Sequence, residues 1–417
     1  MFNEELLLKG KLAKKAALSL GTLSTAQKNQ ALLVMALSLE EQEEVILKAN
    51  AQDLVLAKKQ GMSTALIDRL TLTSERIKDM AEGLRAIVAL EDPVGQVEGM
   101  WKGAQDIEIG RMRVPLGVIG IIYEARPNVT VDAAGLCLKS GNAVILKGGS
   151  DALYSNKAIA EVLAQATETV GLPKGSIQLI ENTSREVTAQ LMKMNEYLDV
   201  LIPRGGAGLI RSVVEKATVP VIQTGMGNCH IYVDEGADLQ MAENIVLNAK
   251  VQRPGVCNAL ETLLVHEKIA REFLPQVATK LTELGVELRG DFLTQALVPQ
   301  AKVASEEDYK MEFLDLILAI KVVNSLEEAI EHIGAYGTQH SEAIVTESYC
   351  KARTFLQSVD AAAVYVNAST RFTDGFQFGY GAEIGISTQK LHARGPMGLK
   401  ELTTIKHIIF GEGQVRK

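Results

Sequence analysis

The chain has 417 residues, of which 47% are hydrophobic and 23% are charged, as in an ordinary globular protein. A single hydrophobic core seldom serves a chain of this length, so we expect more than one domain. The formal net charge of −8 and the scattered lysines and arginines exclude a nucleic-acid-coating protein. The sequence contains no run of 18 apolar residues, which predicts no transmembrane helix and no membrane partner.

Cysteine usage indicates the compartment. The four cysteines are Cys137, Cys229, Cys257 and Cys350, and no two form a C-x-x-C pair. The N-terminus is acidic where a secretory signal would be basic. We therefore expect a cytoplasmic protein with reduced thiols and no structural metal.

The first 92 residues have a helical pattern from about residue 4 onward. Ser24–Gln27 is a capping box ahead of one apolar stripe, and further helices are predicted over Glu40–Gln60 and Thr73–Leu90. Trp101–Arg113 then alternates apolar and polar residues, which predicts an exposed hairpin.

From Val114 onward, continuous apolar runs alternate with helical segments. The predicted strands are Val114–Tyr123, Ala143–Leu146, Ile177–Ile180, Val200–Ile202 and Val219–Ile222. The predicted helices are Val131–Lys139, Ala152–Val170, Ser184–Met194 and Ala207–Lys216. This alternation is typical of a parallel sheet covered on both faces, which binds ligands at the carboxyl ends of its strands.

A second alternation begins near Gly225. A helix is predicted over Asp238–Lys250, and Ser325 is expected to cap another. An irregular loop is expected over Arg371–Gly381 and a last strand within Leu402–Val415. The remaining predicted strands are His230–Val233, Thr262–His266, Leu316–Val323, Ser341–Thr346 and Ala362–Asn367. The chain should therefore contain a second α/β domain.

Two glycine-rich turns follow strands of the first sheet, Lys147–Gly149 and Arg204–Gly208. Turns of this kind let backbone N–H groups approach an anion such as a pyrophosphate. The G-x-G-x-x-G fingerprint is absent, so tight turns without a ligand explain the glycines equally well.

Cys257 follows a Pro254–Gly255 turn, between a predicted helix and a predicted strand. A thiol at such a turn suits a nucleophile, whereas most cysteines are small buried hydrophobes. If the following residues open a helix, its N-terminus would favour the thiolate. The stretch alone leaves both roles open.

Asn128 lies close to the predicted start of a helix. An N-cap is the commoner role for asparagine in that position. The alternative is a side-chain amide that donates to an oxyanion.

Taken together, these stretches resemble the aldehyde dehydrogenase superfamily from end to end. Gly117–Asn128 resembles its glycine-rich strand and the turn with the oxyanion amide, and Ser140–Lys147 resembles its G-N-x-V-x-x-K strand. Gly255–Cys257 matches its nucleophile motif and Met397–Lys406 its C-terminal segment. The resemblance implies an aldehyde dehydrogenase-like α/β fold, with two doubly wound sheet domains and a small oligomerisation hairpin.

One departure from the superfamily concerns its general base, a glutamate about thirty residues before the thiol. Here the corresponding stretch is Gln223–Gly227, which contains no carboxylate. That base activates water to hydrolyse the thioacyl enzyme. Without this base, the thioacyl enzyme is expected to exchange its acyl group with phosphate and not with water.

Longer strings resemble one branch of the superfamily, which reduces L-glutamyl 5-phosphate with NADPH in proline biosynthesis. They are Val114–Gly120, Tyr123–Asp132, Leu201–Leu209, Cys229–Asp234, Val364–Gly375 and Ser387–Gly398. The branch implies L-glutamate 5-semialdehyde and phosphate as products, through a thioacyl enzyme on Cys257. The competing hypotheses are a hydrolytic, acid-forming dehydrogenase and a nucleotide-binding scaffold that has lost catalysis.

The resemblance also assigns the site residues. Cys257 is the expected nucleophile and Asn128 the expected oxyanion donor. The expected cofactor-binding residues are Lys147, Gly148, Gly205, Gly206, Gly225 and Glu312. The expected substrate-binding residues are Arg126, Glu124, Arg253, Arg371, Thr373 and Arg394. Each arginine could instead form a structural ion pair, and Cys137 and Cys229 are interpreted as core residues in apolar surroundings.

This interpretation divides the chain into three functional parts. Residues 1–100 and 114–225 should bind the cofactor, residues 226–385 should carry the nucleophile, and residues 101–113 and 403–417 should form an oligomerisation arm. The resemblance further implies a homo-oligomer and a transient complex with glutamate 5-kinase.

Overall fold

The computed structural model describes residues 2–124 and 126–416 and divides into two compact units. Unit 1 comprises Met1–Thr224, Gly379–Gly385 and Met397–Lys417, and unit 2 comprises Gly225–Phe378 and Ile386–Pro396. Ala125, within the Tyr123–Asp132 string, and the terminal residues of the predicted ranges, Met1 and Lys417, lie outside the described residues. Each unit is described by itself.

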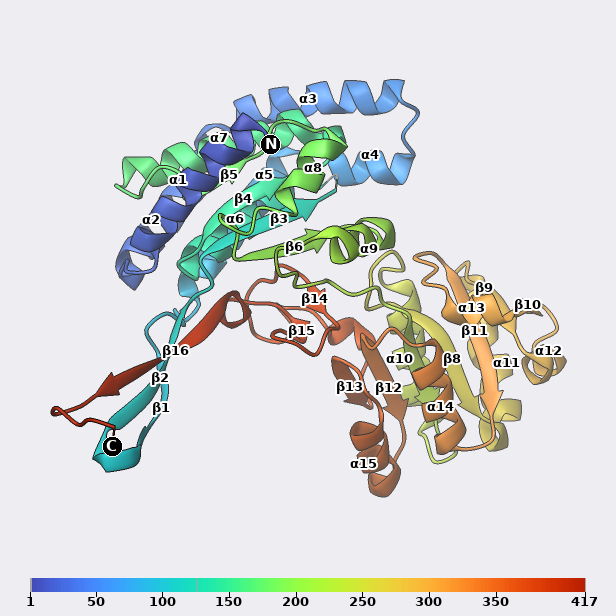
Figure 1. Cartoon of the computed structure of the whole chain (residues 1–417). Helices are drawn as coiled ribbons and strands as arrows, with labels where there is room; N and C mark the ends of the chain where they lie inside the picture. Colours follow the sequence, from blue (N-terminus) through green and yellow to red (C-terminus); the bar gives the residue numbers. More distant parts are fainter. Residues whose placement is uncertain (1, 125, 417) are drawn as a thin grey trace. The chain divides into compact units, whose positions relative to one another are not determined.

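Unit 1 begins with the predicted helices (Figure 1). Ser24 and Gln27 form the predicted capping box, in which Ser24 Oγ accepts from Gln27 N–H. The helices are α1 (Glu4–Leu20), α2 (Thr25–Glu41), α3 (Glu43–Lys59), α4 (Thr64–Leu70) and α5 (Ser74–Ala89). The helical start of the chain is therefore confirmed.

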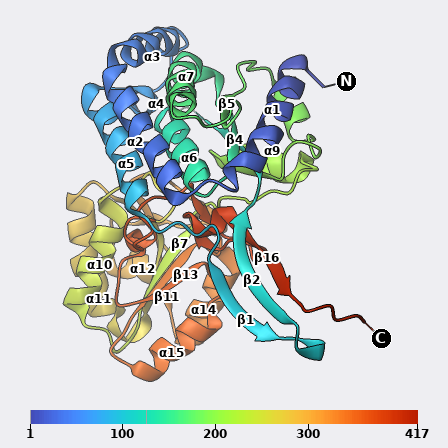
Figure 2. The ribbon, with the colours of Figure 1, turned by 90° about the vertical axis from the view of Figure 1, so that its left-hand side faces the viewer.

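The sheet of unit 1 has the strand order β5-β4-β3-β6, with every pairing parallel. Its strands are β3 (Val118–Tyr123), β4 (Ala143–Lys147), β5 (Ile177–Leu179) and β6 (Val200–Arg204). The connecting helices are α6 (Asn128–Lys139), α7 (Leu153–Thr169), α8 (Arg185–Leu191) and α9 (Ala207–Lys216), with a short turn η2 (Ser150–Ala152). In Figure 2, α1 and α6 lie on opposite sides of β4, so both faces of the sheet are covered as predicted.

Two predicted strands differ from the structure. The run Val114–Tyr123 is broken after Pro115, because Gly117 takes a φ of +125°, and β3 begins only at Val118. The run Val219–Ile222 makes an isolated bridge between Val221 and Leu201 instead of a strand. Pro220 explains the second difference, since it has no N–H to extend the ladder.

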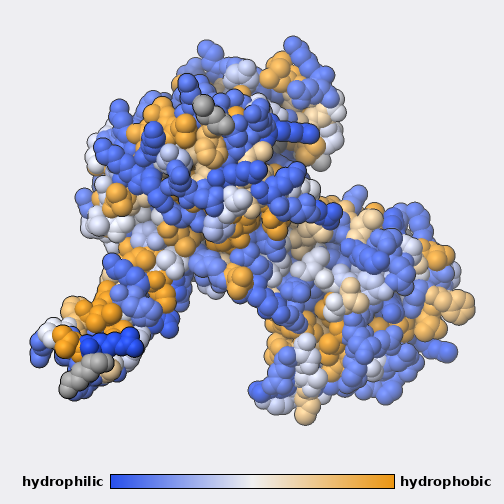
Figure 3. All heavy atoms as spheres, viewed as in Figure 1, coloured by the Kyte–Doolittle hydropathy of each residue, from blue (hydrophilic) through white to orange (hydrophobic). Residues whose placement is uncertain are grey.

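The predicted hairpin and the C-terminal strand form one antiparallel arm, in the order β1-β2-β16. Its elements are β1 (Val97–Lys102), η1 (Ala104–Asp106), β2 (Glu108–Pro115), η4 (Lys400–Leu402) and β16 (Thr403–Phe410). Hydrophobic residues gather on its surface in Figure 3. The exposed ones include Val97, Met100, Trp101, Ile405, Ile409 and Phe410.

Unit 2 contains the second parallel sheet, in the order β10-β9-β11-β8-β7-β12-β13. Its strands are β7 (Cys229–Val233), β8 (Leu260–His266), β9 (Glu287–Gly290), β10 (Lys302–Val303), β11 (Ile317–Val323), β12 (Ser341–Val345) and β13 (Ala363–Val366). The longer helices are α10 (Leu239–Val251), α11 (Glu267–Glu283), α14 (Leu326–Tyr336) and α15 (Tyr349–Ser358). Shorter elements are α12 (Phe292–Leu297), α13 (Glu306–Lys310), η3 (Thr370–Phe372), β14 (Ile386–Ser387) and β15 (Gly395–Pro396).

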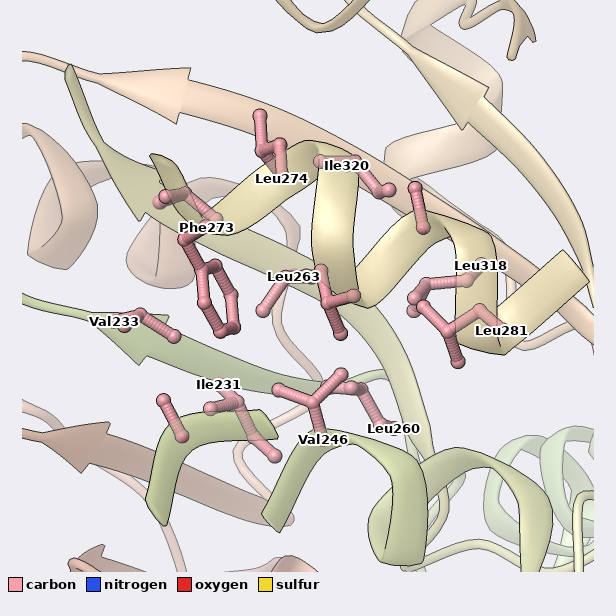
Figure 4. Close-up of a cluster of buried hydrophobic side chains, with 14 of the residues drawn as sticks. Ile231, Val233, Val246, Leu260, Leu263, Phe273, Leu274, Leu281, Leu318 and Ile320 are labelled. Atoms are coloured by element: carbon pink, nitrogen blue, oxygen red, sulfur yellow. The ribbon is translucent and has the colours of Figure 1, made fainter. Parts of the chain in front are cut away.

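The central core of unit 2 lies between its sheet and the helices α10 and α11. Figure 4 shows Leu263 of β8 among side chains that include Val246 of α10 and Phe273 of α11. These side chains are almost fully buried, so β7 and β8 are held rigidly. The Cys257 segment joins α10 to β8 and thus starts and ends on well-packed elements.

The sequence prediction missed β9 and β10, because β10 has two residues and β9 ends in a glycine. The predicted Ser325 cap is confirmed, since Ser325 Oγ accepts from Glu328 N–H. Within the described residues, no helix has both the length and the apolar character that a bilayer crossing requires.

Candidate active site

Cys257 lies in the irregular segment between α10 and β8, where its side chain is partly accessible. No helix begins after Cys257, so that condition for thiolate stabilisation is not met; the chain turns and enters β8 at Leu260, which confirms the predicted strand. The thiol therefore cannot draw on the N-terminus of a following helix. Its activation has to come from neighbouring side chains and backbone groups.

Gly227 packs directly against the backbone of Cys257. A Cβ atom built on Gly227 would lie 1.4 Å from the carbonyl oxygen of Cys257 and 2.7 Å from its Cα atom. No side chain fits in that space, so only glycine permits this approach. The stretch that lacks the superfamily's carboxylate therefore supports the nucleophile segment by backbone contact.

Asn258 anchors the nucleophile segment on its other side. Its Nδ2 atom donates to the carbonyl oxygens of Arg371 at 3.3 Å and Thr373 at 2.9 Å. Its own carbonyl oxygen accepts from Thr370 Oγ1 at 2.7 Å. The side chain is buried, so the peptide that follows Cys257 is fixed to the loop carrying Arg371.

Two arginines bring positive charge to this segment. Arg371 is half-buried and its Nε atom donates to Gln252 Oε1 at 3.1 Å, whereas Arg253 is exposed. Burial lowers the pKa of Arg371, the Arg253 charge lowers it further, and the Cys257 thiol opposes both effects. Cations beside a cysteine favour its thiolate form.

Glu312 supplies a carboxylate to the same region. Its Oε1 atom accepts a hydrogen bond from Gly227 N–H at 2.7 Å. Burial raises the pKa of Glu312, and the bond from Gly227 opposes that change. Glu312, which is one of the predicted cofactor-binding residues, thus lies next to the segment that contacts the nucleophile.

A buried ion pair that the sequence prediction missed holds the Glu312 loop. Lys250 Nζ and Glu261 Oε2 are 2.7 Å apart and both side chains are fully buried. Glu261 Oε1 also accepts from Leu314 N–H at 3.0 Å, where Leu314 adopts a φ of +55°. A glutamate within the apolar run of β8 is the sequence signal that could have indicated this anchor.

In unit 1, Asn128 is the first residue of α6 and does not cap it. Pro127 occupies the N-cap position, so the N-cap interpretation of Asn128 is wrong. The Nδ2 atom of Asn128 donates to Asp132 Oδ2 at 3.2 Å. A spacing of four residues on one helix face is a signal that could have indicated Asp132.

Asp132 has an unusual environment. Burial raises its pKa to about 6, while the Asn128 hydrogen bond and the Arg204 charge act in the opposite direction. Asp132 therefore fixes one hydrogen of the Asn128 amide and titrates close to neutral pH.

Lys147 ends β4, is buried, and donates from Nζ to the carbonyl oxygen of Gly148 at 3.0 Å. Burial lowers its pKa. Gly148 has a packing role, because a Cβ atom there would lie 2.2 Å from Asn156 Nδ2. Both residues are therefore fixed at the carboxyl end of the strand, as a ligand site of a parallel sheet requires.

The exposed turn Gly205–Gly206 leads from β6 into α9. The N–H group of Gly206 donates to Glu124 Oε2 at 2.9 Å. Glu124 thus lies near the N-terminus of α9, where a negative charge is favourable. This arrangement gives Glu124 a local partner within unit 1.

The remaining predicted residues have mixed environments. Thr373 is fully buried and its hydroxyl lies 2.6 Å from Ser341 Oγ and 2.7 Å from Tyr365 Oη, which favours a structural role. Arg394 pairs with Asp360 at 2.8 Å, as the ion-pair alternative predicts. Gly225 N–H donates to Ile386 O at 2.8 Å, and Arg126 is exposed.

The two cysteines interpreted as core residues differ from each other. Cys137 is buried in α6 and burial raises its pKa. Cys229 is also buried, but its surroundings are polar, because its Sγ atom lies 3.2 Å from Cys257 O and 3.8 Å from His340 Nδ1. Among the described residues, no group of histidines, cysteines and carboxylates could hold a metal ion.

Comparison with known proteins agrees with this geometry. The family model described as the aldehyde dehydrogenase family matches residues 10–312, and the chain belongs to this family of oxidoreductases. Like other members it uses a nicotinamide cofactor and acts on a small molecule.

Closer relatives identify the branch. The gamma-glutamyl phosphate reductase of Moorella thermoacetica is 65% identical over 413 residues, which are 99% of each chain. The crystal structure of gamma-glutamyl phosphate reductase from Thermotoga maritima is 52% identical, with a TM-score of 0.97 over 99% of this chain and 100% of that one. The branch predicted from the sequence is therefore confirmed.

A more distant structure shares the fold alone. An acetylating aldehyde dehydrogenase from Geobacillus thermoglucosidasius is 18% identical, with a TM-score of 0.70 over 99% of this chain and 98% of that one. The predicted aldehyde dehydrogenase-like fold is confirmed.

Proposed function

We propose that the chain reduces L-glutamyl 5-phosphate to L-glutamate 5-semialdehyde with release of phosphate, the second step of proline biosynthesis from glutamate. The observation that carries this proposal is the partly accessible Cys257 thiol, close to two arginines and beside a segment without a general base. An acyl phosphate needs no base for its cleavage, since phosphate is a good leaving group at neutral pH. The names of the close relatives support the same substrate.

In the first step, the Cys257 thiolate attacks the acyl carbonyl carbon and the bond from that carbon to the phosphate oxygen breaks. The phosphate leaves with the electron pair of this bond, and the acyl group remains on Cys257 as a thioester. The Asn128 amide and the Cys257 backbone N–H are the proposed donors to the carbonyl oxygen. Donors of this kind contribute about 3 kcal/mol each to transition-state stabilisation.

The absence of a carboxylate side chain from Gln223–Gly227 protects the thioester from water. Glu312 is one carboxylate in this region, but it accepts a hydrogen bond from Gly227 N–H and is therefore held in place. The acyl group then has two fates, which are reduction to the semialdehyde or return to phosphate.

The residues present fit a nicotinamide cofactor. Lys147 lies at the carboxyl end of β4, and the Gly205–Gly206 turn exposes backbone at the start of α9, which suits a pyrophosphate. Glu312 is the proposed ribose partner, and NADPH is the proposed form. When bound, the cofactor supplies the hydride that reduces the acyl group. A pyrophosphate at this turn requires the Glu124 carboxylate to move away from Gly206.

Substrate anions are proposed to bind the arginines near Cys257. Arg371 and Arg253 are the leading candidates, because they bring positive charge to the nucleophile segment of an acidic protein. Arg126 remains a proposed contact, whereas Arg394 and Thr373 are engaged within the fold.

The arm is proposed to pair subunits in a homo-oligomer. It exposes a row of apolar side chains on β1 and β16, which would be costly to leave in water. A transient complex with glutamate 5-kinase and a cytoplasmic location remain predictions from the sequence.

Replacing Cys257 tests the proposal. Cys257→Ala and Cys257→Ser should abolish phosphate-dependent oxidation of the semialdehyde by NADP, and intact mass should show a thioacyl adduct on the wild type but on neither of these variants. Cys350→Ser is the matched control, because Cys350 is an exposed cysteine of the same unit. Activity retained in Cys257→Ala would remove the nucleophile from this account.

A further inference from the structure

Cys229 approaches the nucleophile segment from the start of β7. Its Sγ atom lies 3.2 Å from the carbonyl oxygen of Cys257, within hydrogen-bonding distance for sulfur. Cys229 is fully buried, so the interaction is shielded from water. The contact joins a side chain without an assigned role to the backbone of the proposed nucleophile.

The thiol of Cys229 is the donor in this contact. Burial raises its pKa well above the ordinary value, and the neighbouring Glu342 charge raises it further. The group therefore stays protonated, and a carbonyl oxygen can only accept. An S–H group is a weak donor, so a modest energetic contribution is expected.

Side chains behind Cys229 fix its position. His340 Nδ1 lies 3.8 Å from Cys229 Sγ and 2.9 Å from Ser341 Oγ. Ser341 Oγ continues to Thr373 Oγ1 at 2.6 Å. All of these side chains are buried, so the Cys229 thiol has little freedom to turn away from the Cys257 carbonyl.

The segment Gly227–Cys229 and the anchor Asn258 therefore hold one peptide group from two sides. Gly227 contacts the Cys257 carbonyl by close packing, and Cys229 donates to it. Asn258 binds the loop of Arg371 and Thr373. Holding the backbone in this way leaves few orientations for the Cys257 side chain, which is what a preformed nucleophile requires.

We propose that Cys229 is a positioning residue for catalysis, whose S–H group donates to the Cys257 carbonyl oxygen and fixes the backbone that presents the nucleophile. The inference rests on the proposed function of Cys257. It predicts a loss in the chemical step without a loss in substrate binding, because Cys229 acts only through Cys257.

The test compares Cys229→Ala, which removes the donor, with Cys229→Ser, which keeps one. Loss of one weak hydrogen bond should lower kcat about threefold to tenfold in Cys229→Ala and leave KM for the semialdehyde unchanged. Cys229→Ser should remain within about threefold of the wild type. Cys137→Ala is the matched control, since it removes a buried thiol from unit 1 and should leave kcat unchanged.

The outcomes distinguish a positioning role of Cys229, a purely structural role of Cys229, and a failure of the proposed nucleophile Cys257. Wild-type kcat in a folded Cys229→Ala, or equal losses in the Ala and Ser variants, would overturn the positioning role. If Cys229→Ala does not fold, Cys229→Ser decides alone, and a loss above about threefold in that folded variant would overturn it. Cys257→Ala measured in parallel tests the nucleophile separately, because activity there would end the proposed function whatever Cys229 does.

Discussion

The N–H group of Gly227 donates to Glu312 Oε1 over 2.7 Å, while the same glycine packs against the carbonyl oxygen of Cys257. One backbone position therefore links the proposed ribose-binding carboxylate to the nucleophile segment. Gly227 lies in the stretch where the superfamily carries its general base. Here that stretch serves as a structural support, and the following predictions depend on it.

Gly227→Ala should remove nearly all activity. The added methyl group would coincide with the Cys257 carbonyl, 1.4 Å away, so the nucleophile backbone has to move. A misplaced reacting group of this kind costs about a hundredfold in kcat. Steady-state kinetics, with circular dichroism to establish folding, would measure the effect.

The control for that variant is Gly334→Ala in α14 of the same unit. Nothing lies within 4 Å of a Cβ atom at Gly334, so a methyl group fits there. The change should leave kcat intact and stabilise the helix by about 0.5–1 kcal/mol. Equal activity of the two variants would contradict the proposed role of Gly227 in supporting the nucleophile.

Glu312→Gln should weaken cofactor binding about tenfold, because it removes the charge of a proposed hydrogen-bond acceptor for the ribose. The glutamine can still accept from Gly227 N–H, so the nucleophile segment should keep its structure. Fluorescence titration with NADPH measures the dissociation constant. An unchanged constant would assign Glu312 to the support of Gly227 alone.

Asn128→Ala should lower kcat about a hundredfold to a thousandfold with little change in NADPH affinity. The reason is the loss of a proposed donor to the developing oxyanion. Asp132→Asn should have a smaller effect, since it alters the partner of the Asn128 amide and keeps the amide itself. If Asn128→Ala changed NADPH affinity alone, the oxyanion role would be wrong.

Asp132 should also make the stability of the protein depend on pH. Its pKa in the folded chain is about 6, above the ordinary value of 3.8, so the folded state binds the proton more tightly than the unfolded state. This contribution stabilises the fold at low pH and is lost as the pH rises through about 6. Other groups titrate as well, so the informative quantity is the difference between wild type and Asp132→Asn.

That difference should favour Asp132→Asn increasingly as the pH rises from about 4 to 7. The expected change is about 1–2 kcal/mol, after allowance for the partial exposure of the carboxyl group. Urea unfolding at several pH values would measure it. A difference independent of pH would show that Asp132 titrates at an ordinary pKa.

The sequence was sufficient to predict the parallel sheets, the arm and the branch of the family. Continuous apolar strands such as Ala143–Leu146 and long motif strings carry that information locally. The prediction of a strand over Val219–Ile222 was wrong, because Pro220 has no N–H group to extend the hydrogen-bond ladder.

Such sequence patterns do not predict contacts between residues that lie far apart in the sequence. Nothing local in the sequence places Cys229 beside the Cys257 carbonyl or Glu261 beside Leu314 N–H, since each contact depends on how strands and loops pack. The error at Asn128 was instead local, because the start of α6 lies one residue earlier than an N-cap role for Asn128 requires and Pro127 takes that position. Residues that support a site are therefore harder to predict than those that react in it.

The central claim is that the acyl group on Cys257 passes to a hydride or to phosphate and not to water. Initial rates of NADP reduction with L-glutamate 5-semialdehyde, measured with and without inorganic phosphate, test it most directly. The account predicts steady turnover with phosphate and, without it, a single burst equal to the enzyme concentration. Steady formation of glutamate in phosphate-free buffer would contradict it.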